Sequence, residues 1–444
     1  MNVRPDPDQT TAPGGGVVAP APPRTLEEIG IGPVMLRDVV LKTMFRKSVS
    51  TTRAVADAIH LPVPLTSRLI DQCRDANLLQ SMGTMHAGSS GEMAFQLTDA
   101  GKARAADALA QSEYYGAMPV PLEAYKLQVK AQSVGDVRIT RERLTRAMGH
   151  LVMPPALLDQ LGPAVSSGRS VLMYGPPGNG KSSIAEGIRA ALGDHIWIPR
   201  AIEYAGQIIT VYDPIVHTAI PRRADDTGLR RSGQRVDERY VLCQRPTVMT
   251  GGELTLSMLD LNYNAVARTY QASLQLKSTG GVFIVDDLGR QEEAPQKLIN
   301  RWIVPMEMGY DILALQSGEK FEVPFDTLVV FSTNFHPNEI FDVAALRRIF
   351  FKVMIEGPSQ QDFLKIFSMV AKKKKVKLDE ASLVHLLKRK YPSIGNTYAN
   401  YHAPFILDQI SAICDFEGLP HAMTPELVDR AWDNLFVRKA DFAH

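Results

Sequence analysis

The sequence predicts an α/β protein: a parallel sheet with helices on its faces, a smaller α+β domain in front and a helical domain behind. Three apolar runs of strand length each end in glycine, carboxylate or amide residues, as buried parallel strands do at a ligand-binding edge. The first run leads through a glycine-rich loop into an amphipathic helix. After Pro358 the apolar residues recur at helical spacing, which predicts the last domain.

Length and charge limit the classes of function. The 444 residues are enough for about three domains. Lys and Arg number 49 against 48 Asp and Glu, so no overall field attracts nucleic acid or an anionic membrane. The three cysteines lie far apart, without the spacing of a zinc site or a disulfide framework. With no signal peptide and no bilayer-length apolar stretch, we expect a cytoplasmic protein without a membrane partner.

The first domain follows a leader. Residues 1–25 are rich in Pro and Gly and poor in large apolar residues, which predicts disorder. Residues 26–112 predict three short helices, two strands around the tip His86–Gly91, and a closing helix that starts at Thr98. This order of elements resembles a winged helix-turn-helix domain.

DNA is not the favoured partner of this domain. Residues 34–110 carry nine basic and seven acidic side chains, a net charge of only +2. The expected recognition helix offers Ser67, Arg68 and Gln72 together with Thr66, but Asp71 and Asp75 beside them repel phosphates. The sequence therefore favours docking to a protein over reading of DNA.

A phosphate-binding loop opens the main unit. After a connector over residues 113–139, the α/β unit covers residues 140–357. The segment Gly175–Ser182 fits G-x-x-x-x-G-K-[ST] between an expected strand and helix, so Lys181 is expected to reach ATP phosphates and Ser182 to bind Mg²⁺. The residues expected to touch the nucleotide are Gly175, Pro176, Pro177, Gly178, Asn179, Gly180, Lys181, Ser182 and Ser183. The sequence thus predicts an ATPase.

A second strand supplies carboxylates. The segment Gly280–Asp287 runs from four apolar residues into Asp286 and Asp287. Asp286 is expected to bind Mg²⁺, and Asp287 to polarise the attacking water.

Over residues 140–440 the order of features resembles AAA+ ATPases. Leu328–Asn334 looks like the sensor 1 strand, with Asn334 orienting water or touching the γ-phosphate, and Asp342–Ile349 is similar to the arginine-finger segment of Clp-type disaggregases. The resemblance makes Arg347 and Arg348 candidate fingers toward a neighbouring subunit, in a homo-oligomer that we expect to be a hexameric ring. It also implies that residues 358–444 form a helical lid.

The chain departs from the AAA+ pattern in two places. Asp287 stands where the class usually has Glu, so the base is one methylene shorter. The class usually has a sensor 2 arginine in the lid, yet Tyr391–Ile413 contains no Arg or Lys, and His402 is a weak substitute.

Insertions separate the motifs. Asp286 lies 105 positions after Lys181, whereas a strand-helix-strand step needs about 30 residues. We expect a mobile loop at Pro221–Arg239, a hairpin at Tyr240–Gly252 and a second hairpin at Ile312–Val323. Hairpins at these places resemble those of the MoxR-like and related clades, where they act on a client, and surface decoration is the equally favoured alternative.

Another short segment, Tyr204–Gly206, is similar to the pore loop of protein-threading rings, although a buried tyrosine is the simpler interpretation.

The sequence leaves three functions open. The leading one is a mechanoenzyme that binds Mg-ATP between subunits and remodels an unknown protein client. The second is a DNA-associated ATPase or regulator that uses its front domain to select a site. The third is a nucleotide-gated scaffold with low turnover, which stays open because of Asp287 and the missing lid arginine.

Overall fold

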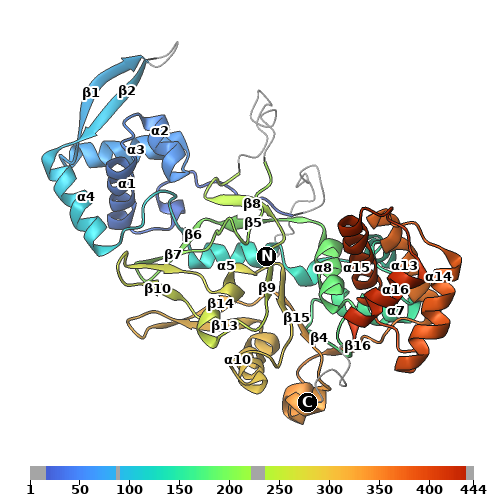
Figure 1. The fold of residues 1–444 in the computed structure, drawn as a ribbon. Coiled ribbons are helices and arrows are strands. Elements are labelled where there is room, and N and C mark those ends of the chain that lie inside the picture. Colours follow the sequence, from blue (N-terminus) through green and yellow to red (C-terminus); the bar gives the residue numbers. More distant parts are fainter. Residues whose placement is uncertain (1–16, 87–90, 222–235, 437–444) are drawn as a thin grey trace, which may run out of the picture.

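The computed structural model describes residues 17–86, 91–221 and 236–436. The chain passes from a front domain at one end, through a central region with two sheets, to a helical lid at the other end (Figure 1). We call the parallel sheet with its helices the core, and the second sheet with the elements packed on it the insert.

The core sheet has five parallel strands. In spatial order they are β16 (Phe351–Met354), β4 (Val171–Tyr174), β15 (Leu328–Thr333), β12 (Val282–Val285) and β9 (Thr247–Thr250). Every residue of β12 and β15 is buried, as expected for strands covered on both faces. The strands predicted before Gly175, Asp286 and Asn334 are therefore confirmed.

Helices cover both faces of this sheet. On one face Ile184 and Leu161 share a hydrophobic cluster with Val171. On the other face Trp302 packs against Phe283. The core helices are α6 (Arg141–Ala147), α7 (Pro155–Ser166), α8 (Lys181–Leu192), α10 (Pro295–Met308), α11 (Pro337–Ile340) and α12 (Val343–Leu346).

The insert is built from separate stretches of chain. Its sheet has the order β10-β11-β7-β6-β3, so it joins a strand that precedes the core to strands inserted after α8 and before β12. The strands are β3 (Val120–Pro121), β6 (Ala201–Tyr204), β7 (Gln207–Thr210), β10 (Asn262–Asn264) and β11 (Thr269–Gln271). Helix α5 (Leu122–Ala131), α9 (Leu274–Lys277) and the hairpin β13 (Tyr310–Ala314) and β14 (Lys320–Pro324) share one hydrophobic cluster with this sheet. The connector is thus part of the insert, and the second predicted hairpin is confirmed.

The first predicted hairpin, Tyr240–Gly252, is wrong. Strand β8 (Tyr240–Gln244) pairs with β5 (His195–Pro199), whereas β9 joins the core sheet. Arg245 lies between β8, which forms a separate two-stranded sheet with β5, and β9 of the core sheet. It is only 5% exposed, and its side chain binds Asp194 and the backbone carbonyl of Gly280. Arg245, where the sequence indicated a turn, is thus a buried anchor. Only one of the two hairpins on which the resemblance to the MoxR-like clade was based is present, and that resemblance stays a prediction.

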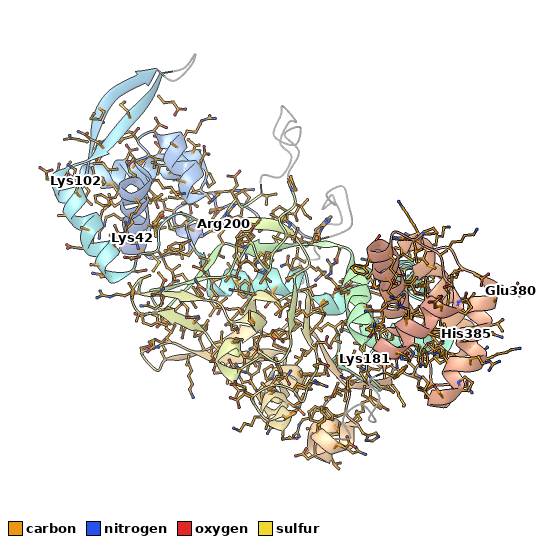
Figure 2. The ribbon with its side chains drawn as sticks, in the orientation of Figure 1. Lys42, Lys102, Lys181, Arg200, Glu380 and His385 are labelled. Carbon is orange, nitrogen blue, oxygen red and sulfur yellow. The ribbon has the colours of Figure 1, made fainter. Side chains whose placement is uncertain are left out.

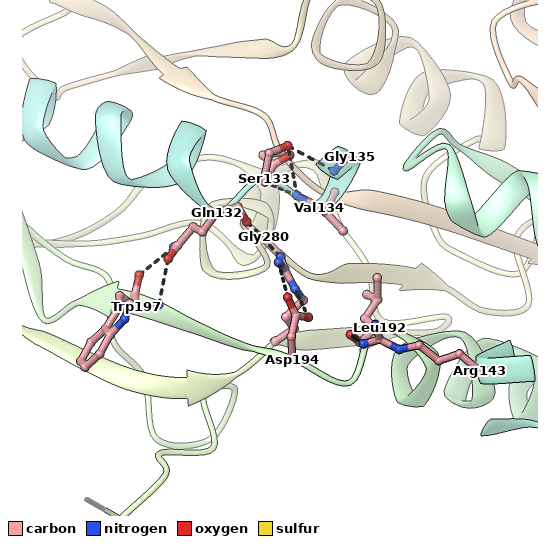
Figure 3. Close-up of polar contacts among 11 residues, drawn as sticks. Gln132, Ser133, Val134, Gly135, Arg143, Leu192, Asp194, Trp197 and Gly280 are labelled. Carbon is pink, nitrogen blue, oxygen red and sulfur yellow. Dashed lines mark hydrogen bonds and ion pairs between the residues drawn. The ribbon is translucent and has the colours of Figure 1, made fainter. Parts of the chain in front are cut away.

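A polar network joins core and insert around this anchor (Figure 3). Arg245 Nη1 also donates to the carbonyl of Gln132, whose side chain bonds both backbone groups of Trp197. Asp326 accepts from the hydroxyl of Ser133 at 2.7 Å. Side chains at the end of the connector therefore tie β5 to the segment that precedes β15.

Two expectations of disorder are also wrong in part. The carbonyls of Val18 and Pro20 accept hydrogen bonds from Gln128 Nε2 (3.0 Å) and Asp237 N (2.9 Å), so the end of the expected leader packs on the insert. Arg239, 4% exposed, forms an ion pair with Asp237, so the end of the expected mobile loop is buried. Residues 1–16 and 222–235, which hold the rest of these two predictions, lie outside the described part.

The front domain has the predicted order of elements. After η1 (Glu27–Ile29) come α1 (Pro33–Lys47), α2 (Thr52–Ile59), α3 (Val63–Asp75), β1 (Leu79–His86), β2 (Gly91–Leu97) and α4 (Asp99–Gln111). Thr66 is fully buried in α3, where its hydroxyl donates to the carbonyl of Pro62, so it is not available for recognition. The likeness to a winged helix stays a prediction, and the tip at residues 87–90 lies outside the described part.

The lid is helical, as predicted. Its elements are α13 (Gln360–Lys374), α14 (Glu380–His385), the π-helical turn η5 (Leu386–Lys390), η6 (Tyr391–Ile394), α15 (His402–Glu417) and α16 (Pro425–Leu435). Phe363 and Trp432 pack edge-on against Tyr391 in its core. Among the described helices of the chain, none combines the length and apolar character needed to cross a membrane.

Candidate functional site

The glycine-rich loop joins β4 to α8 as predicted. Gly178 and Gly180 have φ angles of +76° and +83°, in the left-handed region that glycine adopts without strain. Lys181, 7% exposed, turns back into the loop, where its Nζ donates to the carbonyls of Gly175 (2.9 Å) and Pro176 (3.0 Å). Figure 2 shows Lys181 at the side of the core next to the lid.

A chain of hydrogen bonds joins three predicted residues. Lys181 Nζ donates to Asn334 Oδ1 at 2.7 Å, and Asn334 Nδ2 donates to Asp287 Oδ1 at 2.9 Å. Burial lowers the pKa of Lys181, while the charges of Asp286 and Asp287 oppose that shift. The ends of β12 and β15 therefore bring their polar residues to the loop.

The predicted metal ligands also lie together. Ser182 Oγ donates to Asp286 Oδ2 at 2.6 Å. Mg²⁺ prefers such hard oxygen ligands and often takes one or two from the protein, so a hydroxyl beside a carboxylate suits it.

Asp287 has an unusual backbone, held by a residue that sequence reasoning missed. Its φ is +49°, which is uncommon for a residue other than glycine. The amide of Gln291 donates to the carbonyl of Asp286 (3.2 Å) and of Gly251 (2.9 Å), and it accepts from the N–H of Gly289 (2.9 Å). Gln291 belongs to no motif, so only the fold reveals that it holds the acidic turn in place.

A cavity of about 610 Å³ lies between the glycine-rich loop, the segment before α7 and the lid. Asn179, Gly180 and Ser183 line it, as expected for nucleotide contacts, while Pro177 is exposed on the loop. The remaining walls are mostly apolar and include Leu151, Val152, Met153, Ile355, Ile366 and Pro404. Sequence reasoning missed these residues, because an apolar wall needs no distinctive residue type.

The two candidate finger arginines lie elsewhere. Arg347 and Arg348 line another cavity, of about 780 Å³, that shares no lining residue with the first. Arg348 Nε is bound to Glu307 at 2.8 Å. Arg347 is exposed and has no ion-pair partner among the described residues. The structure therefore does not bring either arginine to the glycine-rich loop of its own chain.

His402 does not replace the missing lid arginine. It is 4% exposed and its Nδ1 lies 3.0 Å from the hydroxyl of Tyr391, inside the lid. Burial lowers its pKa to about 4, which keeps it uncharged at neutral pH. The weak substitution suggested by its position is wrong. The lid residues that contact the loop are Asn400 and Tyr401, which no motif marked.

The segment Tyr204–Gly206 forms the turn between β6 and β7. Tyr204 is half-buried, its ring stacked on Phe321 at 4.4 Å and its hydroxyl donating to Glu319 at 3.0 Å. It is thus neither fully buried nor free, and joins two hairpins of the insert.

Comparisons with known proteins give partial matches. Residues 359–434 match a family described as a domain of unknown function, DUF8689. The Holliday junction branch migration motor RuvB of Thermotoga maritima is 13% identical with a TM-score of 0.36, covering 69% of this chain and 74% of that chain. NtrX of Brucella abortus in complex with ADP is 12% identical with a TM-score of 0.40, covering 77% and 67%. No curated protein matches the sequence.

The architecture of the chain itself defines its fold. The glycine-rich loop follows β4, which lies between β16 and β15 in the parallel sheet, and polar residues end the neighbouring strands beside it. A helical lid follows the last strand and contacts the loop. With this arrangement of sheet, phosphate loop and lid, the chain has the fold of a P-loop NTPase with a helical lid.

Proposed function

We propose that this chain is an ATPase that binds Mg-ATP between subunits of a homo-oligomer and remodels a protein partner. The observation that carries the proposal is the convergence of Lys181, Asn334 and Asp287 in one hydrogen-bonded chain beside the pair of Ser182 and Asp286. These groups lie where two parallel strands end, as ligand-binding residues of open α/β sheets do.

Nucleotide binding uses two neighbouring regions. The apolar cavity suits a base, and the glycine-rich loop suits phosphates because its N–H groups lie at the start of α8. Lys181 already donates to three protein oxygens, so a phosphate must displace at least one of them. Asn334 is the partner whose release leaves the loop carbonyls undisturbed.

Ser182 and Asp286 would hold Mg²⁺ through their oxygen atoms. When bound, the ion supplies positive charge that stabilises the phosphate oxygens.

Hydrolysis uses Asp287 and Asn334. The water oxygen forms a bond to the γ-phosphorus, the bond from that phosphorus to the bridging oxygen breaks, and ADP leaves with the bond electrons. Asp287 accepts the proton of the water, and the amide of Asn334, 2.9 Å from that carboxylate, orients the water.

The arginines support assembly. Arg347, exposed and unpaired in the described part, is free to reach the nucleotide of a neighbouring subunit, whereas the ion pair with Glu307 engages Arg348. We therefore assign the finger role to Arg347. The hexameric ring and the client follow from the likeness to AAA+ proteins alone.

The test separates binding from turnover. Lys181→Ala removes the cation that contacts phosphate and should abolish binding of fluorescently labelled ATP. Asp287→Asn should leave the affinity within about twofold and lower phosphate release about 10²-fold or more. Glu292→Gln, an exposed carboxylate in the same region, is the matched control and should keep the parent rate.

If Asp287→Asn hydrolyses ATP at the parent rate while Glu292→Gln does not, Glu292 is the base. If the parent chain releases no phosphate in any assembly state, it is a nucleotide-gated scaffold.

A further inference from the structure

Among the described residues, three hydrogen bonds connect the lid to the phosphate loop. Asn400 Nδ2 donates to the carbonyl of Asn179 at 2.9 Å, and the N–H of Asn400 donates to Asn179 Oδ1 at 3.3 Å. The N–H of Tyr401 donates to the carbonyl of Gly178 at 3.0 Å. All three contacts are made by neutral groups, and they join residues more than 200 positions apart in the sequence.

The contact leaves no room between lid and loop. A Cβ on Gly178 would lie 2.1 Å from the ring of Tyr401, and a Cβ on Gly357, where the lid begins, would lie 2.4 Å from the carbonyl oxygen of Tyr398. Both distances are shorter than any ordinary contact of a Cβ atom. The segment at residues 398–401 is therefore fixed between the start of the lid and the phosphate loop.

The same residues border the nucleotide cavity. Asn179 and Asn400 both line it, and Asn179 is 3% exposed. Asn400 Oδ1 is buried and has no hydrogen-bond partner among the described residues, so this amide acts through its donor. Tyr391–Ile413, where a lid arginine is expected, has no Arg or Lys, and His402 turns inward. The charged lid residues that line the cavity, Asp362 and Lys373, lie on α13 and make none of these three bonds to the loop.

We propose that Asn400 and Tyr401 position the phosphate loop in place of a lid arginine, and that the lid retains nucleotide by neutral hydrogen bonds to the backbone of the loop. The proposal rests on the proposed function for the identity of the ligand. Asn400 is a positioning residue, because it acts on phosphate through Asn179, as Tyr401 acts through Gly178.

This arrangement has a consequence for nucleotide selectivity. An arginine that contacts the γ-phosphate strengthens the binding of ATP more than that of ADP, because ADP lacks this group. A lid that holds the loop backbone through hydrogen bonds of neutral groups strengthens the binding of both nucleotides by the same factor. The ratio of ATP and ADP affinities therefore distinguishes a lid that positions the loop from a lid that senses charge.

The experiment measures affinities of fluorescently labelled ATP and ADP for the full chain, with Asp287→Asn present throughout to block hydrolysis. Asn400→Ala should weaken the binding of both nucleotides by a similar factor, about five- to tenfold, as expected for one lost hydrogen bond. Asn400→Asp should weaken binding further, since its carboxylate faces the carbonyl of Asn179. Thr397→Ala is the matched control, because Thr397 is exposed on the same segment, and it should change neither affinity.

A second measurement needs no substitution in the lid. Hydrogen exchange on the parent chain should show that ADP protects the amides of residues 178–182 and 398–401 together, because the two segments are bonded to each other. Protection of the loop alone would contradict the proposal.

The failures can be told apart. If the parent chain binds neither nucleotide, the proposed function is overturned and this proposal falls with it. If the parent binds both and Asn400→Ala binds them equally well, or loses affinity for ATP alone, only the proposed role of the lid is overturned.

Discussion

The core and the insert are both built around a five-stranded sheet, yet different interactions hold them. In the core, β12 pairs in parallel with β15 and β9 along all four of its residues. In the insert, β3 contributes only two residues, and buried ion pairs of Arg245 and Arg239 secure the surrounding chain. Core strands can thus be recognised by apolar runs that end in functional residues, whereas the insert depends on contacts between distant polar residues.

The largest expected effect concerns the core. Arg347→Ala should lower ATP turnover about 10³-fold or more if this side chain stabilises the transition state on a neighbouring subunit. Arg348→Ala, the matched control, should lower ATP turnover by less than about tenfold, because Glu307 already forms an ion pair with Arg348. Phosphate release at a protein concentration that supports assembly measures both.

Mixing two inactive variants tests whether Arg347 acts on a neighbouring subunit. Arg347→Ala chains and Lys181→Ala chains should each be inactive, while their mixture should regain activity wherever an intact loop meets an intact arginine. A co-assembled mixture that stays inactive, or a dilute monomer with full turnover, would contradict a role across subunits.

The next effect concerns the insert. Arg245→Ala leaves Asp194 without its partner in a buried setting, so it should lower the free energy of unfolding by about 3–5 kcal/mol. Arg141→Ala removes an ion pair with Asp159 in which both side chains are more than half exposed. This substitution should change the free energy of unfolding by less than about 1 kcal/mol. Urea unfolding measures the difference. Equal stability of the two variants would mean that the insert does not depend on its buried anchor.

A smaller effect is expected on the pH dependence of stability, which can be measured for both the lid and the front domain. Burial lowers the pKa of His402 to about 4 from an ordinary value of 6.5, so the unfolded chain binds the proton more readily than the folded one. The stability contributed by neutral His402 is complete above pH 6.5 and is lost as pH falls toward 4, by up to about 3 kcal/mol. His402→Gln should flatten this part of the stability curve.

His60 in the front domain offers the matching measurement. Burial also lowers its pKa to about 4, so His60→Asn should remove acid sensitivity from the front domain in the same pH range. If neither substitution alters the profile between pH 6.5 and 4, the two histidines are not buried as neutral groups.

The smallest expected effect is on the affinity of the chain for DNA. With a net charge of only +2 over residues 34–110 and Thr66 buried, the full chain should bind random duplex DNA no more tightly than about 10⁻⁴ M at physiological salt. Arg68→Ala should change this affinity by less than about twofold. Tight binding that falls steeply with salt in a fluorescence titration would instead favour the DNA-associated alternative.

Sequence reasoning identified side chains that meet in the fold where chemistry restricts the residue type. Lys181, Asp287 and Asn334 come from three separate motifs and meet because parallel strands carry their carboxyl ends to one edge. Arg245 was misinterpreted because Arg-Pro between two strands has the same pattern whether the chain turns back or crosses to another sheet. Asn400 was missed because a neutral amide that bonds a backbone carbonyl has no distinctive spacing.

Because the strands of the insert sheet come from distant stretches of the chain, they are synthesised at different times during translation. Strand β3 ends at Pro121, but its partner β6 begins at Ala201. At translation rates of about 5–20 residues per second, roughly 4–16 seconds pass before that partner has been synthesised. Ala201 and Ile208, on which the front domain packs, emerge only after the phosphate loop. The front domain is therefore synthesised before the residues on which it packs.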